Sequence, residues 1–119
     1  MKLLTEENRE RLLRNGKLRL QCQSEGKDGP DFLPVVKLFT PDAHCTWLLT
    51  EIDPEDPDIA FGLCDLGMNC PELGSVSLSE LESVRGKLGL PVERDLHFHP
   101  TKMLSIYADE ARQHGYIQA

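Results

Sequence analysis

The chain has 119 residues, 39% of them hydrophobic and 28% charged, which suits one globular domain with one core. Its 20 acidic and 13 basic residues give a net charge of −7, so it is a poor generic binder of nucleic acid, whose phosphates must be neutralised. Nothing approaches the ~18 consecutive apolar residues of a transmembrane helix, and the N-terminus becomes charged too early for a signal peptide. We therefore expect a cytoplasmic protein with reduced cysteines and no membrane association.

The first quarter of the chain predicts a helix, a strand and a loop. Thr5 is a good N-cap and Gly16 a good C-terminal residue for a helix over residues 6–15. Lys17–Gln23 then alternates apolar and polar residues, which is typical of a half-exposed strand. Ser24–Asp31 is polar and rich in glycine, and it predicts a loop.

Three apolar runs of strand length come next: Val35–Phe39, Cys45–Ile52 and Ile59–Leu66. Turn signals that contain proline separate them, so we predict a three-stranded antiparallel meander. Because strand side chains alternate, Trp47 and Glu51 should share one face of the middle strand and Ile52 the other. Trp47 is the only tryptophan, and we place it in the core.

The last third of the chain continues with short elements. Leu73–Leu78 predicts a strand, and Ser79 begins a capping box that starts a short helix near 79–86. Asp95–His99 alternates again and predicts another strand. Thr101 is expected to cap a final helix with apolar residues at helical spacing.

This order of elements predicts an α+β fold. We expect a single domain over residues 1–119, built on a mainly antiparallel sheet of about four to six strands. The N-terminal and C-terminal helices are expected to cover one face of that sheet.

Asp95, His97 and His99 are the best candidates for chemistry. On a strand they would share one face at about 7 Å per step, and two imidazoles with a carboxylate suit zinc or iron. The pattern predicts a small metal-dependent enzyme as one alternative, with His44 or Cys70 as a further ligand if the fold brings either close. A solvated edge strand explains the same spacing. The sequence contains no nucleotide-binding, nucleophile or metalloprotease motif, so a protein without catalytic activity or cofactor is favoured.

Five carboxylates gather at the second turn of the meander: Glu51, Asp53, Glu55, Asp56 and Asp58. Two prolines among them hold the turn extended, which limits the entropy lost on docking. We interpret the turn as a surface for a basic, unidentified protein partner. An ordinary exposed turn would have the same composition.

The beginning of the chain has the opposite charge. Residues 1–20 contain six basic and three acidic residues. The basic residues that follow the N-cap are Arg9, Arg11, Arg14, Lys17 and Arg19. They predict weak DNA binding as a further alternative. The other interpretation is that they face the acidic loops of their own fold.

Seven motifs cover much of the chain: Leu38–Ala43, Thr46–Glu51, Asp58–Gly67, Glu72–Gly74, Ser77–Leu81, Gly89–Asp95 and Leu96–Phe98. They resemble a bacterial family of proteins of unknown function, the domain of unknown function numbered twenty-nine fifty-eight. The resemblance implies a short cytosolic accessory protein carried on plasmids and other mobile DNA, and it transfers no catalytic residue. We therefore expect an interaction module that serves mobile-DNA maintenance through its acidic surface.

Overall fold

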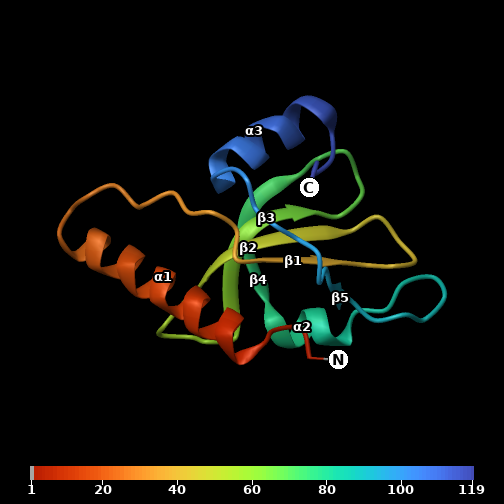
Figure 1. Cartoon of the computed structure of the whole chain (residues 1–119), viewed down its shortest axis with the longest axis horizontal. Helices are drawn as coiled ribbons and strands as arrows, with labels where there is room; N and C mark the ends of the chain where they lie inside the picture. The colour runs from red at the N-terminus through yellow and green to blue at the C-terminus, as the bar shows by residue number, and fades with distance from the viewer. Residues whose placement is uncertain (1) are drawn as a thin grey trace.

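The computed structural model describes residues 2–119 as three helices and five strands (Figure 1). The helices are α1 (Glu6–Ser24), α2 (Leu78–Ser83) and α3 (Leu104–His114). The strands are β1 (Val36–Phe39), β2 (Thr46–Ile52), β3 (Ile59–Asp65), β4 (Glu72–Ser77) and β5 (Glu93–Arg94). All pair antiparallel in one sheet of order β4-β3-β2-β1-β5. The predicted α+β class, the meander and the strand after it are confirmed.

Apolar side chains cover both faces of the sheet. On one face, Trp47 packs in a cluster with Leu12 of α1 and Leu81 of α2. The neighbouring residue Leu48 points to the other face and packs with Leu104 of α3. The prediction that the terminal helices share one face is therefore wrong, and α3 lies apart from α1 across the sheet (Figure 1). The placement of Trp47 in the core is confirmed.

Helix α1 is longer than predicted, because Gly16 is a packing position and not a helix end. Thr5 caps the helix as predicted, but the helix continues through Lys17–Gln23, so the predicted strand is wrong. A Cβ atom on Gly16 would lie 1.8 Å from the carbonyl oxygen of Ile52. Glycine therefore allows the backbones of α1 and β2 to approach closely.

A bulge in β2 changes the predicted faces. The pairing with β3 shifts between Leu49 and Glu51, which leaves Thr50 as an extra residue. Because a shift of one residue reverses the alternation, Ile52 joins the cluster of Trp47. Glu51 is turned to the opposite face, so its predicted face and that of Ile52 are wrong.

The two later helices begin at caps other than those predicted. The Ser77 hydroxyl accepts a backbone N–H of the first turn of α2, so Ser77 is the N-cap in place of Ser79. Thr101 does not cap α3. Asp31, from the loop after α1, accepts the backbone N–H of Ser105 at 3.3 Å and also its hydroxyl. These contacts fix the start of α3 to the loop after α1.

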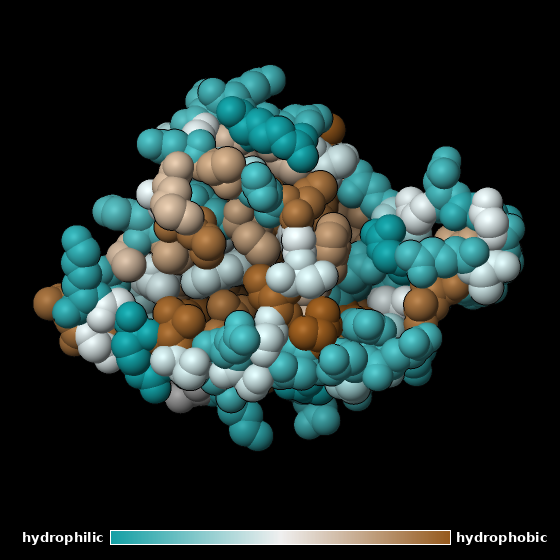
Figure 2. Space-filling model, turned by 180° about the vertical axis from the view of Figure 1, so that it is seen from behind, coloured by the Kyte–Doolittle hydropathy of each residue, from teal (hydrophilic) through white to brown (hydrophobic). Residues whose placement is uncertain are grey.

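Several large apolar side chains are exposed on the surface. Seen from behind, such side chains gather across the middle of the molecule below α3, with polar side chains around them (Figure 2). Exposed large apolar residues elsewhere include Met68, Leu88 and Leu96. No helix in the part of the chain that the structure describes has the length and apolar character needed to cross a membrane.

Candidate functional site

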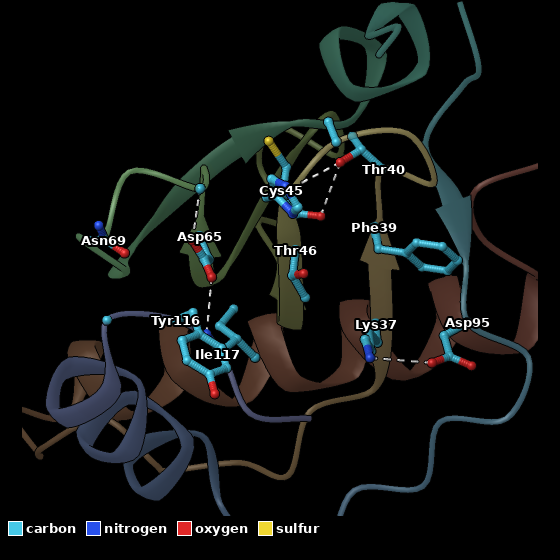
Figure 3. Close-up of a pocket in the computed structure, with 14 residues that line it drawn as sticks. Lys37, Phe39, Thr40, Cys45, Thr46, Asp65, Asn69, Asp95, Tyr116 and Ile117 are labelled. Carbon is cyan, nitrogen blue, oxygen red and sulfur yellow. Dashed lines mark hydrogen bonds and ion pairs between the residues drawn. The ribbon is translucent and has the colours of Figure 1, made fainter. Parts of the chain in front are cut away.

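A cleft of about 570 Å³ opens where β1, β2 and the end of β3 meet the residues that follow α3 (Figure 3). Its walls include the side chains of Lys37, Thr46, Asp65 and Tyr116. Its size lies within the range of about 300–1,000 Å³ that is usual for sites of small ligands. The cleft is therefore one candidate for the binding of a ligand.

The charged groups of the cleft are already engaged in holding its walls. Asp65 is buried, and its two carboxylate oxygens accept the backbone N–H of Gly67 at 2.9 Å and that of Ile117 at 3.0 Å. Lys37 lies 3.4 Å from the carboxylate of Asp95 and donates to a C-terminal backbone carbonyl at 2.6 Å. These contacts hold the walls of the cleft in place. The buried carboxylate of Asp65 is occupied by hydrogen bonds that stabilise the fold.

The predicted metal ligands do not lie on a strand. β5 ends one residue before Asp95, whose carboxylate accepts the backbone N–H of His97 at 2.9 Å and closes a turn. This hydrogen bond is the largest cause that lowers the pKa of the Asp95 carboxyl. Among residues 2–119, no three His, Cys, Asp or Glu side chains are grouped to hold a metal ion, so neither His44 nor Cys70 completes a set with His99. The described residues do not fit a zinc or iron site.

The five carboxylates of the predicted acidic surface fall into two groups. Asp53, Glu55 and Asp56 are exposed. Glu51 is only 5% exposed, and its carboxylate lies 2.5 Å from Nε of Arg19. Glu51 is therefore not part of the exposed acidic surface, because Arg19 of α1 pairs with its carboxylate.

Arg19 is part of the fold. Its guanidinium lies 5.8 Å from the ring centre of Phe32 and 5.9 Å from that of Phe61. It also donates to the carbonyl of Pro30 at 2.8 Å. Ion pairing to Glu51 and contact with two rings occupy this cation, so it is not free to neutralise a DNA phosphate.

Asp58 joins the turn between β2 and β3 to the start of α2. Its carboxylate accepts the hydroxyl of Ser77 at 2.6 Å, and the backbone N–H and the hydroxyl of Ser79 at 2.9 Å and 3.0 Å. These donors lower the pKa of the Asp58 carboxyl, with the Ser77 hydroxyl as the largest cause. Asp58 is therefore a structural residue as well as a charged one.

The other basic residues of the predicted DNA-binding segment are exposed on α1: Arg9, Arg11, Arg14 and Lys17. At about 100° per residue, these four positions spread over about 200° of the helix circumference. Glu7 and Glu10 lie between them. The helix therefore has no single basic stripe of the kind that follows a nucleic-acid backbone.

Neither Cys64 nor Cys70 provides an activated nucleophile. All four are free thiols. Burial raises the pKa of the Cys64 thiol to about 11. Cys70 is exposed, but its hydrogen bond to Glu72 raises the pKa of its thiol as well. Reactive cysteines need the opposite shift.

Sequence reasoning missed the role of Asp42, which follows the proline of the first turn of the meander. One oxygen of this carboxylate accepts the backbone N–H of Leu88 at 2.6 Å and that of Leu90 at 3.3 Å. The other oxygen is buried without a hydrogen-bond partner. Asp42 thus fixes a distant loop whose tip, Leu88, is 80% exposed. No local signal at Asp42 indicates a contact so far along the chain.

Comparison with known proteins yields one match. The model of the family described as "Protein of unknown function (DUF2958)" matches residues 3–118. Neither the curated proteins nor the solved structures include a significant match. Because the family model covers nearly the whole chain, the chain belongs to the DUF2958 family, as the motifs predict.

Proposed function

We propose that this member of the DUF2958 family is a cytosolic accessory protein that binds a basic protein partner. The contact surface is the group of three exposed carboxylates Asp53, Glu55 and Asp56, which we name the acidic turn. The observation that carries this proposal is the absence of any cation paired with these three carboxylates among residues 2–119. Charge that folding leaves unpaired can attract a partner of opposite charge.

The acidic turn is ordered before any partner arrives. Asp53 accepts the backbone N–H of Glu55 at 2.9 Å through its carboxylate, and Asp56 accepts that of Asp58 at 3.3 Å. Backbone hydrogen bonds from Asp53 to Ile59 and from Ile59 to Asp56, both 2.9 Å long, close the turn. An ordered surface loses less conformational entropy on binding, which favours recognition.

A narrower form of the proposal follows from what the motif resemblance implies, an accessory protein of plasmids and mobile DNA. Accessory proteins of bacterial plasmids and mobile elements work beside DNA-binding proteins, whose basic surfaces contact phosphate. The acidic turn can bind such a basic surface in place of DNA. The net charge of −7 adds long-range attraction to the same partner.

The test compares two variants with the same change in net charge. The first replaces Asp53→Asn, Glu55→Gln and Asp56→Asn. The matched control replaces the exposed residues Glu7→Gln, Glu10→Gln and Asp28→Asn. Each immobilised protein is exposed to lysate of bacteria that carry the parent DNA element. The retained proteins are quantified, and any protein that distinguishes the two variants is purified for kinetics.

The expected result is a basic protein retained by the wild type and by the control but lost with the first variant. Its association rate at low salt should fall at least about tenfold for that variant, and the salt dependence of the rate should flatten. If no retained protein distinguishes the first variant from the control, the acidic turn is an ordinary exposed turn.

A second candidate function is the binding of a small polar ligand in the cleft of Figure 3, favoured by its volume of about 570 Å³. Thr46 lies on its wall. A panel of polar metabolites screened by thermal shift should then include one that raises the melting temperature of the wild type but not that of Thr46→Leu. A panel without such a compound counts against this function.

A further inference from the structure

The two edges of the sheet differ in length and protection. At one edge, β5 has two residues, and Arg94 donates to the carbonyls of Lys2 and Leu3 at 2.8 Å and 2.9 Å. These bonds bring the N-terminal segment beside the short strand. At the other edge, β4 has six residues and no strand on its outer side among residues 2–119. Edge strands are usually shortened, bulged or protected by lysine or proline, and Glu72–Ser77 contains neither residue.

The ladder shows which backbone groups of β4 are open. The N–H of Leu78 donates to the carbonyl of Asp58 at 2.8 Å, one position beyond the pair of Ser77 with Ile59. Hydrogen-bonded pairs alternate in an antiparallel ladder, so residues 72, 74 and 76 bond to β3. Residues 73 and 75 then turn their N–H and C=O groups to the open side. Ser77 turns its N–H there, while its C=O begins α2.

We propose that β4 pairs antiparallel with β4 of a second copy of this chain, which joins the two sheets into one. The open residues 73, 75 and 77 are symmetric about Ser75. When Ser75 faces Ser75 of the second copy, Leu73 lies opposite Ser77 and Ser77 opposite Leu73. A two-fold axis at this point satisfies the open N–H and C=O groups of Leu73 and Ser75, except that the N–H of Leu73 faces the Ser77 carbonyl already used by α2, and it gives the N–H of Ser77 the carbonyl of Leu73.

The side chains of β4 are compatible with this register. Its one charged residue, Glu72, would lie at opposite ends of the paired segment in the two copies, about 20 Å apart at ~3.3 Å per residue. That distance exceeds the screening length of about 8 Å at physiological salt. Leu73, which is 40% exposed, would gain a neighbouring strand. A Cβ atom on Gly74 meets nothing within 4 Å, so the face of the sheet beside this edge is also uncovered there.

This dimer is independent of the proposed function. The acidic turn connects β2 and β3 and contributes no open backbone group to the edge of β4. A protein that dimerises without binding a basic partner, or binds one as a monomer, therefore separates the two proposals.

The variant Ser75→Pro tests the pairing. The N–H of Ser75 faces away from β3, so proline removes a donor to the second copy but no hydrogen bond within one chain. Ser75→Thr is the matched control, because it keeps the N–H and suits a strand. By sedimentation, the wild type and Ser75→Thr should be dimers and Ser75→Pro a monomer. Hydrogen exchange at the amides of residues 73 and 77 should be slow in the wild type and fast in Ser75→Pro.

A second variant distinguishes loss of pairing from misfolding caused by proline. Leu73→Lys adds a charge at the edge without changing the backbone, and it should also be a monomer. A wild type that stays monomeric at the highest concentration reached overturns the proposal. So does a dimer that persists in both Ser75→Pro and Leu73→Lys, or one whose amide of Ser75 exchanges rapidly.

Discussion

Trp47 provides the most direct test of the core at the scale of one residue. Its side chain is 3% exposed and packs on the face of the sheet that α1 covers. Trp47→Ala should lower the free energy of unfolding by about 3–5 kcal/mol, because the surrounding side chains cannot fill the space. Urea denaturation followed by circular dichroism measures this change. The control Leu88→Ala removes an exposed side chain and should cost less than about 0.5 kcal/mol. An unchanged midpoint for Trp47→Ala would place the indole on the surface.

Gly16 gives a prediction in which two effects oppose each other. Alanine favours a helix over glycine by about 1 kcal/mol. The added methyl group would, however, lie 1.8 Å from the backbone oxygen of Ile52. We expect the clash to dominate and Gly16→Ala to lose about 1–3 kcal/mol of unfolding free energy. Gly74→Ala is the control, since its added methyl group meets nothing within 4 Å. A Gly16→Ala protein more stable than the wild type would contradict the close packing of α1 on β2.

The same glycine shows what the sequence can indicate at this scale. Thr5 and Gly115 act through neighbours in the chain, and both are caps of their helices, with Gly115 in the left-handed conformation at a φ of 82°. Gly16 has the same local context as a helix end. Its role depends on Ile52, which is adjacent only after folding. A sequence pattern therefore predicts a local cap but not a close approach between distant elements.

At the scale of elements, the strands predicted from apolar runs are present, whereas those predicted from alternation alone are not. β2 and β3 are rich in branched and apolar residues and lie in the middle of the sheet. Lys17–Gln23 and Asp95–His99 alternate, yet the first is helical and the second contains a turn. In the second segment, Leu96 is exposed. Alternation predicts a strand only where one face has a core to join.

Asp58 links two elements and gives a prediction with a pH dependence. The folded state lowers the pKa of its carboxyl, with the Ser77 hydroxyl as the largest cause. Its contribution to stability is therefore present above the ordinary aspartate pKa of about 3.9 and lost as pH falls through the lower folded value. Asp58→Asn should lower the melting temperature at pH 7. The difference from the wild type should shrink as the solution is acidified below about pH 4.

Calorimetry across this pH range measures the effect of Asp58→Asn. Glu55→Gln, in the same turn, is the control and should leave the melting temperature close to that of the wild type, because no hydrogen bond joins its side chain to α2. A difference between Asp58→Asn and the wild type that grows toward acid pH would show that the carboxylate does not stabilise this junction.

At the scale of the whole molecule, the candidate sites differ in how far the sequence indicates them. The five carboxylates at the second turn of the meander are visible in composition, and three of them, which form the acidic turn, are exposed. The exceptions depend on distant residues, since Arg19 of α1 engages Glu51 and the start of α2 engages Asp58. The cleft has walls from four separated parts of the chain, so no stretch of sequence indicates it. Charge density is a local property, whereas a concave surface is a property of the tertiary structure.

The sheet also determines how the molecule unfolds. Trp47 and Leu104 lie in clusters on opposite faces of the same strands, so loss of either cluster exposes the strands that support the other. Leu104→Ala should cost about 2–5 kcal/mol, and it should shift the unfolding curve of Trp47 fluorescence as much as that of far-ultraviolet circular dichroism. Coincident curves identify one cooperative unit. Leu88→Ala, at an exposed loop position away from the edge of β4, is the control and should shift neither curve strongly. A fluorescence midpoint that stays in place while the dichroism curve divides into two steps would show that α3 and its cluster unfold independently of the rest of the sheet.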